Sequence, residues 1–168
     1  MFQVGDYIVY GSSGVCEVKN VGTMDMSGIA KGRLYYTLLP VYSNGSTIYT
    51  PVDNEKIVMR KILTKEEAME RIRQIPEIEP LWIADEKKRE ESYKEAMKTC
   101  SFENLIKIIK TLYLRRQSRL AGGKKLATID ERYLKMAEDG LYGELAISLD
   151  MKKEEMEAFI TKQVEQTS

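Results

Sequence analysis

Histidine is absent from the 168 residues of the chain. The sequence therefore lacks the side chain that most often transfers protons near neutral pH and that most often binds catalytic metals. Only two cysteines are present, Cys16 and Cys100, and they are far apart in the sequence. This spacing supplies neither a paired-cysteine metal motif nor a disulfide framework. We expect a protein that is not an enzyme and that holds no metal or cofactor.

Long apolar runs are missing as well. No stretch approaches the roughly 18 residues that a helix needs to cross a membrane. The first residues, MFQVGDYIVY, lack the basic segment and the apolar core of a secretory signal. The 26 basic residues are balanced by 26 acidic ones. We expect a cytoplasmic monomer without a membrane or small-molecule partner.

The first third of the sequence has the pattern of β-strands. Up to Leu63, Val, Ile, Tyr and Thr recur with period two, and clusters of Gly, Ser and Asn interrupt them. The Asn44-Gly45 pair predicts a hairpin turn, since both residues tolerate positive φ. Residues 1–63 are therefore predicted to form a small all-β barrel of the SH3 or Tudor kind. Its strands are expected at residues 7–10, 15–23, 34–42, 46–50 and 57–63.

Helical patterns follow from residue 64 onward. The tetrapeptides TKEE (64–67) and TIDE (128–131) each have the form of a capping box, and two prolines in residues 75–82 predict an irregular linker. The sequence therefore predicts a two-domain α+β fold, with an all-α helical bundle over residues 64–168. Its five helices are expected at about residues 65–75, 84–98, 102–120, 128–149 and after residue 150.

Positive charge is concentrated in one part of this neutral chain. Residues 101–127 carry seven basic side chains and a single acid, Glu103. Such a local concentration is typical of a surface that binds a polyanion such as nucleic acid. Three alternatives remain open. Cations also favour helix C-termini, Arg116 falls within the apolar stripe of its helix and can extend from there to solvent, and acids of neighbouring helices can neutralise the patch.

Two other residues are candidates for this surface. Trp82, the sole tryptophan, lies in the proline-containing linker and is either a packing anchor or an exposed wedge against nucleic-acid bases. We favour the anchor, since buried aromatic residues outnumber exposed functional ones. Arg89 lies four residues before Tyr93, so the two share a helix face and would extend a basic groove.

Several segments together resemble the CarD/CdnL family of bacterial transcription regulators. They are FQVGDYIVYGSSGVCEV, YYTLLPVY and STIYTPVDN in the first part, and W-I-x-D-E-K-K-R-E-E-S-Y-K-E-A-M, IIKTLYLRRQ, GGKKLATIDERYLKMAE and LYGELA in the second. The order and spacing of these segments, rather than any single one, carry the resemblance. It covers residues 2–149.

The resemblance implies a function for both domains. The Tudor-like domain would bind the β subunit of RNA polymerase, as does the related module of the transcription-repair coupling factor. The helical domain would contact promoter DNA at the upstream edge of the transcription bubble, independently of sequence, and stabilise the open complex. The residues implied over phosphates are Arg115, Arg116, Arg119, Lys124 and Lys125. The alternative is a protein-protein adaptor whose basic patch binds an acidic protein partner, without DNA.

The sequence departs from the family at two places. The tryptophan wedge of some members aligns with Arg89, seven residues after Trp82. Polymerase-binding arginines of some members align near residues 24–26 and with Tyr49, which carry no positive charge here. We therefore expect a more apolar polymerase contact, formed by strand addition at an open barrel edge. The residues expected there are Met24, Thr47 and Tyr49, with Arg33 as a replacement charge.

Overall fold

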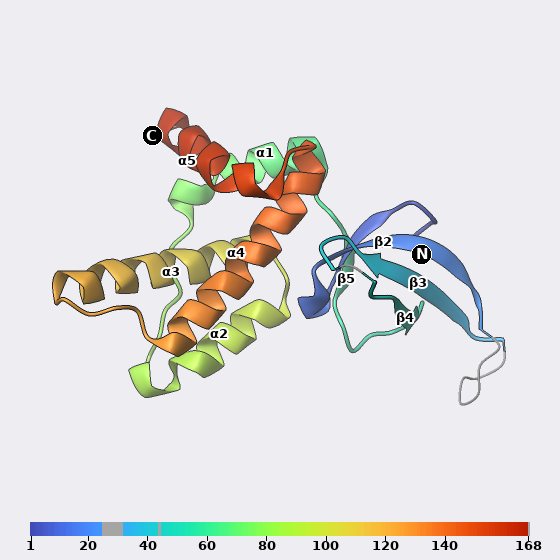
Figure 1. Ribbon diagram of the computed structural model, residues 1–168, viewed down its shortest axis with the longest axis horizontal. Coiled ribbons are helices and arrows are strands. Elements are labelled where there is room, and N and C mark those ends of the chain that lie inside the picture. The colour runs from blue at the N-terminus through green and yellow to red at the C-terminus, as the bar shows by residue number, and fades with distance from the viewer. Residues whose placement is uncertain (25–31, 44, 168) are drawn as a thin grey trace. The chain divides into compact units, whose positions relative to one another are not determined.

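A β domain and a helical domain make up the computed structural model (Figure 1), which describes residues 1–24, 32–43 and 45–167. The chain divides into Met1–Ile62 and Leu63–Ser168, and each part has a hydrophobic core of its own. The predicted two-domain α+β fold is confirmed. The division falls one residue before the boundary expected from the sequence pattern.

One antiparallel sheet with strand order β4-β3-β2-β1-β5 forms the β domain. The last strand returns to the first, so that Arg60 lies opposite Val9. Two strands have their predicted bounds and the other three differ from them by a few residues, whereas Asn44 of the predicted hairpin turn lies outside the described residues. The strands are β1 (Tyr7–Tyr10), β2 (Val15–Thr23), β3 (Leu34–Pro40), β4 (Ile48–Pro51) and β5 (Met59–Lys61).

The core of the β domain consists of alternate strand residues. Ile8, Cys16, Val18 and Leu38 are fully buried, as the period-two pattern requires. Burial raises the pKa of the Cys16 thiol to about 11, so that this cysteine stays protonated and serves as a packing residue. In the described ladder β4 and β5 are the two edge strands of the sheet.

Five α-helices follow in the described part of the helical domain, and each is too short or too polar to cross a membrane. The capping box at the first helix is confirmed, since the Glu67 amide donates to Thr64 Oγ1 at 3.1 Å and the Thr64 amide donates to Glu67 Oε1 at 3.0 Å. The helices are α1 (Lys65–Arg73), α2 (Arg89–Lys98), α3 (Phe102–Ala121), α4 (Thr128–Leu149) and α5 (Met156–Thr167).

The second predicted capping box is wrong. Ala127, which has no side-chain acceptor, occupies the cap position of α4, and Thr128 is already its first helical residue. The reason is tertiary: the carboxylates of Asp130 and Glu131 bind arginines from other helices instead of turning back to the α4 backbone. A local signature of four residues cannot reveal such partners.

The helix α4 is the centre of the helical domain, with the other helices packed around it (Figure 1). Its residues Leu134, Ala137, Leu141 and Leu145 are buried in the domain core. Gly140 faces Leu105 of α3, and a Cβ added there would lie 3.6 Å from Leu105 Cδ1, an ordinary van der Waals distance. The crossing of α3 and α4 therefore does not require glycine at this position.

Candidate nucleic-acid interface

Asp130 is a buried acid that joins three helices. Its side chain is 0% exposed, and its Oδ1 atom accepts hydrogen bonds from Arg89 Nε at 2.9 Å and from the Tyr93 hydroxyl at 2.8 Å. Its Oδ2 atom accepts from Arg115 Nε at 3.3 Å. Two of the predicted DNA-binding arginines, from α2 and α3, therefore converge on one carboxylate of α4.

The charge state of Asp130 follows from these partners. Burial by itself would raise the pKa of its carboxyl group, because desolvation disfavours the charged form. The hydrogen bonds from Arg89 and Tyr93 and the charge of Arg115 outweigh burial and lower that pKa below its ordinary value. Asp130 is therefore ionised at neutral pH and holds both guanidinium groups in place. Arg115 also forms an ion pair with Glu86.

Acids outside the basic segment neutralise part of its charge. Arg116 pairs with Glu131 of α4 at 3.4 Å and lies over the Tyr113 ring. This pair is solvent-exposed and is therefore a weak interaction. Counting charges along residues 101–127 overstated the exposed positive charge, because Asp130 and Glu131 follow the segment in sequence and adjoin it in space.

The cations of the basic segment beyond Arg116 have no acidic partner among the residues that the structure describes. Arg119 Nε donates to the backbone oxygen of Lys125 at 2.6 Å, which closes the loop between α3 and α4. Gly123 adopts a positive φ of 75° in this loop, and Leu126 is buried behind it. Lys124 and Lys125 are exposed and form no ion pair with any residue that the structure describes. The loop thus presents two free cations on a fixed backbone.

The lysines in the first half of α3 have other roles. Lys107 pairs with Glu103 one turn earlier, at 3.7 Å. Lys110 Nζ donates to the backbone oxygens of Ile75 and Ile78, so that its ammonium group fastens the linker to α3. The exposed cations of the basic segment therefore belong to its second half.

Trp82 does not pack onto the bundle: it is 82% exposed. The anchor interpretation is therefore wrong. The neighbouring residues Leu81 and Ile83 contact the core instead, and the Leu81 amide donates to Thr111 Oγ1 at 2.8 Å. This bond fastens the linker to α3, one turn before the arginines. Trp82 is thus held beside the basic half of the helix while its ring faces solvent.

Two exposed lysines, Lys87 and Lys88, lie outside the basic segment of residues 101–127. The structure places them in a 3-10 turn, Glu86–Lys88, that Asp85 caps by accepting from the Lys87 amide at 3.0 Å. Both lysines are exposed and have no ion pair within the described residues. Since Glu86 of the same turn binds Arg115, this turn adjoins the basic half of α3. Asp85, a residue type that favours the cap position of a helix or turn, was the sequence signal for this turn.

The residues predicted for polymerase binding lie in the β domain around β4. Thr47 is exposed just before this edge strand, and Tyr49 within it is 50% exposed. Met24, half-buried, follows β2. Arg33 pairs with Asp53 at 3.1 Å, in an exposed position next to β3. Residues 25 and 26 lie outside the described part of the chain.

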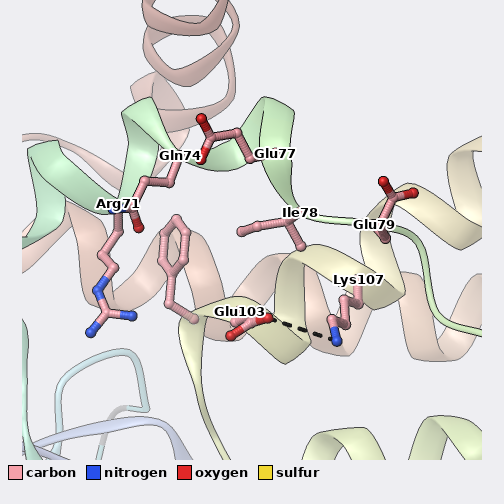
Figure 2. Close-up of a pocket in the computed structure, with 8 residues that line it drawn as sticks. Arg71, Gln74, Glu77, Ile78, Glu79, Glu103 and Lys107 are labelled. Carbon is pink, nitrogen blue, oxygen red and sulfur yellow. Dashed lines mark ion pairs between the residues drawn. The ribbon is translucent and has the colours of Figure 1, made fainter.

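A pocket of about 340 Å³ opens between α1, the linker and the start of α3 (Figure 2). Phe102 lines it together with side chains of both charges, among them Arg71, Glu77 and the Glu103–Lys107 ion pair. Within the described residues, no group of three or more acids or cysteines is placed to hold a metal ion.

Comparisons with known proteins agree with this division of the chain. The family model for the CarD-like/TRCF RID domain matches residues 2–63, and the model for the CarD C-terminal domain matches residues 79–161. The chain belongs to the CarD-like family. These domains indicate a transcription factor that interacts with RNA polymerase, and they point to a non-catalytic role. A comparison with curated proteins found no match.

Proposed function

We propose that this CarD-like chain binds the β subunit of RNA polymerase through its β domain and contacts promoter DNA through its helical domain. The observation that carries the DNA contact is Trp82, which is exposed in a linker that is fastened to α3 at Thr111, one turn before Arg115. An exposed aromatic ring and exposed cations on one domain suit a nucleic acid, which offers both base faces and phosphates. The contact lies at the upstream edge of the transcription bubble and stabilises the open complex.

The DNA contacts are electrostatic and largely independent of sequence. Arg119, Lys124 and Lys125 neutralise phosphates and release counterions, and Arg116 exchanges Glu131 for a phosphate. Arg89 and Arg115 each donate a hydrogen bond from Nε to Asp130. Their Nη1 groups donate to Glu86, that of Arg89 to the backbone oxygen and that of Arg115 to the carboxylate. The Nη2 group of each arginine is left to bind a phosphate. These two arginines therefore offer a phosphate hydrogen-bond donors at fixed positions, whereas an exposed lysine offers a charge that can move.

The mechanism requires no chemical step. A factor that binds the melted promoter more tightly than the closed one shifts the equilibrium by the difference in affinity. The polymerase contact raises the local concentration of the helical domain at the DNA, so weak phosphate contacts suffice. A factor of bacterial RNA polymerase acts in the cytoplasm, on one polymerase at a time, and we expect it to act as a monomer.

Replacing Trp82 by Ala is expected to shorten the half-life of the open complex by about tenfold, because stacking of an aromatic ring on a base contributes roughly 1 to 3 kcal/mol. The melting temperature should not change, because the ring is exposed. The half-life is measured with purified polymerase and a promoter fragment after addition of a competitor. Met136→Ala, an apolar truncation on α4, is the control. Equal half-lives for both variants would exclude a role of Trp82 at the DNA.

Replacing Tyr49 by Asp is expected to weaken binding to the polymerase β subunit by about tenfold or more, since it places a charge in the centre of an apolar contact. Binding is measured by capture of purified β subunit on the full-length chain. Val4→Asp adds the same charge at an exposed apolar position outside β4 and should bind normally. If the Tyr49 variant captures the β subunit as well as the natural chain does, the polymerase contact does not lie at β4.

A further inference from the structure

The two domains meet at consecutive residues whose backbone amides are held by different domains. The Ile62 amide donates to the Tyr7 carbonyl oxygen at 3.2 Å. This bond continues the pairing of β1 with β5 one residue beyond Lys61, the last residue of β5. Ile62 is thereby the final residue whose position is fixed by the β domain.

The next amide belongs to the helical domain. The Leu63 amide donates to Glu144 Oε2 of α4 at 2.9 Å, and the Leu63 side chain packs against the helical core. Glu144 is only 3% exposed. The Thr64 amide then donates to Glu67 in the capping box of α1. From Leu63 onward, the chain is therefore fixed to the helical domain by both backbone and side chain.

We propose that the joint between the domains is confined to Ile62, the residue between the two held amides, with Glu144 as the positioning residue. Since each peptide unit is planar and both amides are hydrogen-bonded, the free rotations are φ and ψ of Ile62. A linker of several residues would instead allow the second domain a large volume. The joint thus acts as a hinge.

Glu144 suits this role because of its charge and its burial. A carboxylate accepts a backbone hydrogen bond more strongly than a neutral group does, and the bond is shielded from water here. A buried carboxylate in turn needs such donors, so that Leu63 and Glu144 stabilise each other. Loss of the acceptor frees the Leu63 amide without touching the Ile62 bond in the β domain.

This hinge has a consequence that rests on the proposed function. If the β domain is bound to polymerase, a hinge of one residue lets the helical domain sample a smaller volume than a longer linker would, so its effective concentration at the nearby DNA is higher. Lengthening the joint lowers that concentration. Glu144, though remote in sequence from the basic residues, then determines how well they reach the promoter.

Amide hydrogen exchange of the full-length chain tests the joint without polymerase. In Glu144→Met, which keeps side-chain length but removes the acceptor, exchange of the Leu63 amide should accelerate by about tenfold or more, while that of Ile62 stays the same. Glu144→Gln retains an amide oxygen as acceptor and should restore most of the protection. Unchanged Leu63 exchange in the Met variant, or equal acceleration at Ile62, would overturn the proposal.

An insertion of Gly-Ser-Gly-Ser between Ile62 and Leu63 tests the hinge if the Met variant does not fold. Amide NMR relaxation should show correlated tumbling of the two domains in the natural chain and more independent tumbling after the insertion. Equally independent tumbling in both would overturn the proposal. The insertion should also shorten the open-complex half-life toward that of polymerase alone, whereas an unchanged half-life would refute the link to the promoter. If the natural chain itself has no effect on the half-life of the open complex, the proposed function is wrong. The hinge is then tested by amide hydrogen exchange and NMR relaxation alone.

Discussion

Replacing Asp130 by Asn is expected to lower the free energy of unfolding of the helical domain by about 3 kcal/mol, since removal of one partner from a buried ion pair leaves the others uncompensated. The substitution hardly changes the volume of the side chain, so the effect reports the lost charge. Arg89 and Arg115 would keep their positive charges in positions that are only 23% and 26% exposed. The buried Tyr93 hydroxyl would lose a charged acceptor.

Chemical denaturation followed by the helical circular dichroism signal measures this loss. The control is Glu131→Gln, which removes the neighbouring carboxylate of α4. Because the Arg116–Glu131 pair is exposed, that control should change the free energy of unfolding by less than about 1 kcal/mol. Similar effects of the two substitutions would show that Asp130 does not hold the three helices together.

The same carboxylate makes stability depend on pH in a defined direction. The pKa of Asp130 is lower in the folded chain than its ordinary value of about 3.9, so folding favours the ionised form. Its contribution is complete above that ordinary value and is lost as the pH falls through the lower, folded-state pKa. Stability curves of the natural chain and of Asp130→Asn should therefore converge below about pH 4. A constant difference down to pH 2 would contradict this assignment.

Local sequence patterns predicted the strands and helices of the fold. Where a predicted feature is absent, the cause is a contact with a residue far away in the sequence. Alternation in residues 7–23 is a property of the strand itself, and the structure places both strands there as expected. The segment TIDE has the same local form as TKEE, yet of these two segments only TKEE forms a capping box. The difference lies in Arg116 of α3, which pairs with Glu131, the carboxylate of the predicted second box. No local pattern contains that information.

The candidate interface was predictable as a region but not residue by residue. The concentration of cations in residues 101–127 is visible in the sequence, whereas pairing with acids depends on how α4 crosses α3. Trp82 was misjudged for a related reason: buried aromatics are the more common case, but here Leu81 and Ile83 occupy the apolar positions of the linker. The Glu144 contact with Leu63 spans 81 residues and leaves no local signal at all.

Reversing the two free charges of the α3–α4 loop should have the largest effect on promoter binding. In Lys124→Glu/Lys125→Glu, two attractive phosphate contacts become repulsive, and we expect the affinity of the polymerase-bound chain for promoter DNA to fall by about a hundredfold at low salt. The fold should be unaffected, because both side chains are exposed and the loop is held by Arg119 and Leu126 instead.

The salt dependence of this effect separates a phosphate contact from any other role of the loop. Each lost contact lowers the slope of log affinity against log salt concentration by about 0.9, so the double variant should have a slope smaller by about 2. The slope is measured from open-complex half-lives at a series of salt concentrations. Lys65→Glu/Lys162→Glu makes the same change in net charge at exposed positions of α1 and α5 and should keep the natural slope. If both variants lose affinity equally, the loop acts only through the net charge of the protein. If the loop variant loses affinity with an unchanged slope, these lysines contact a group other than phosphate.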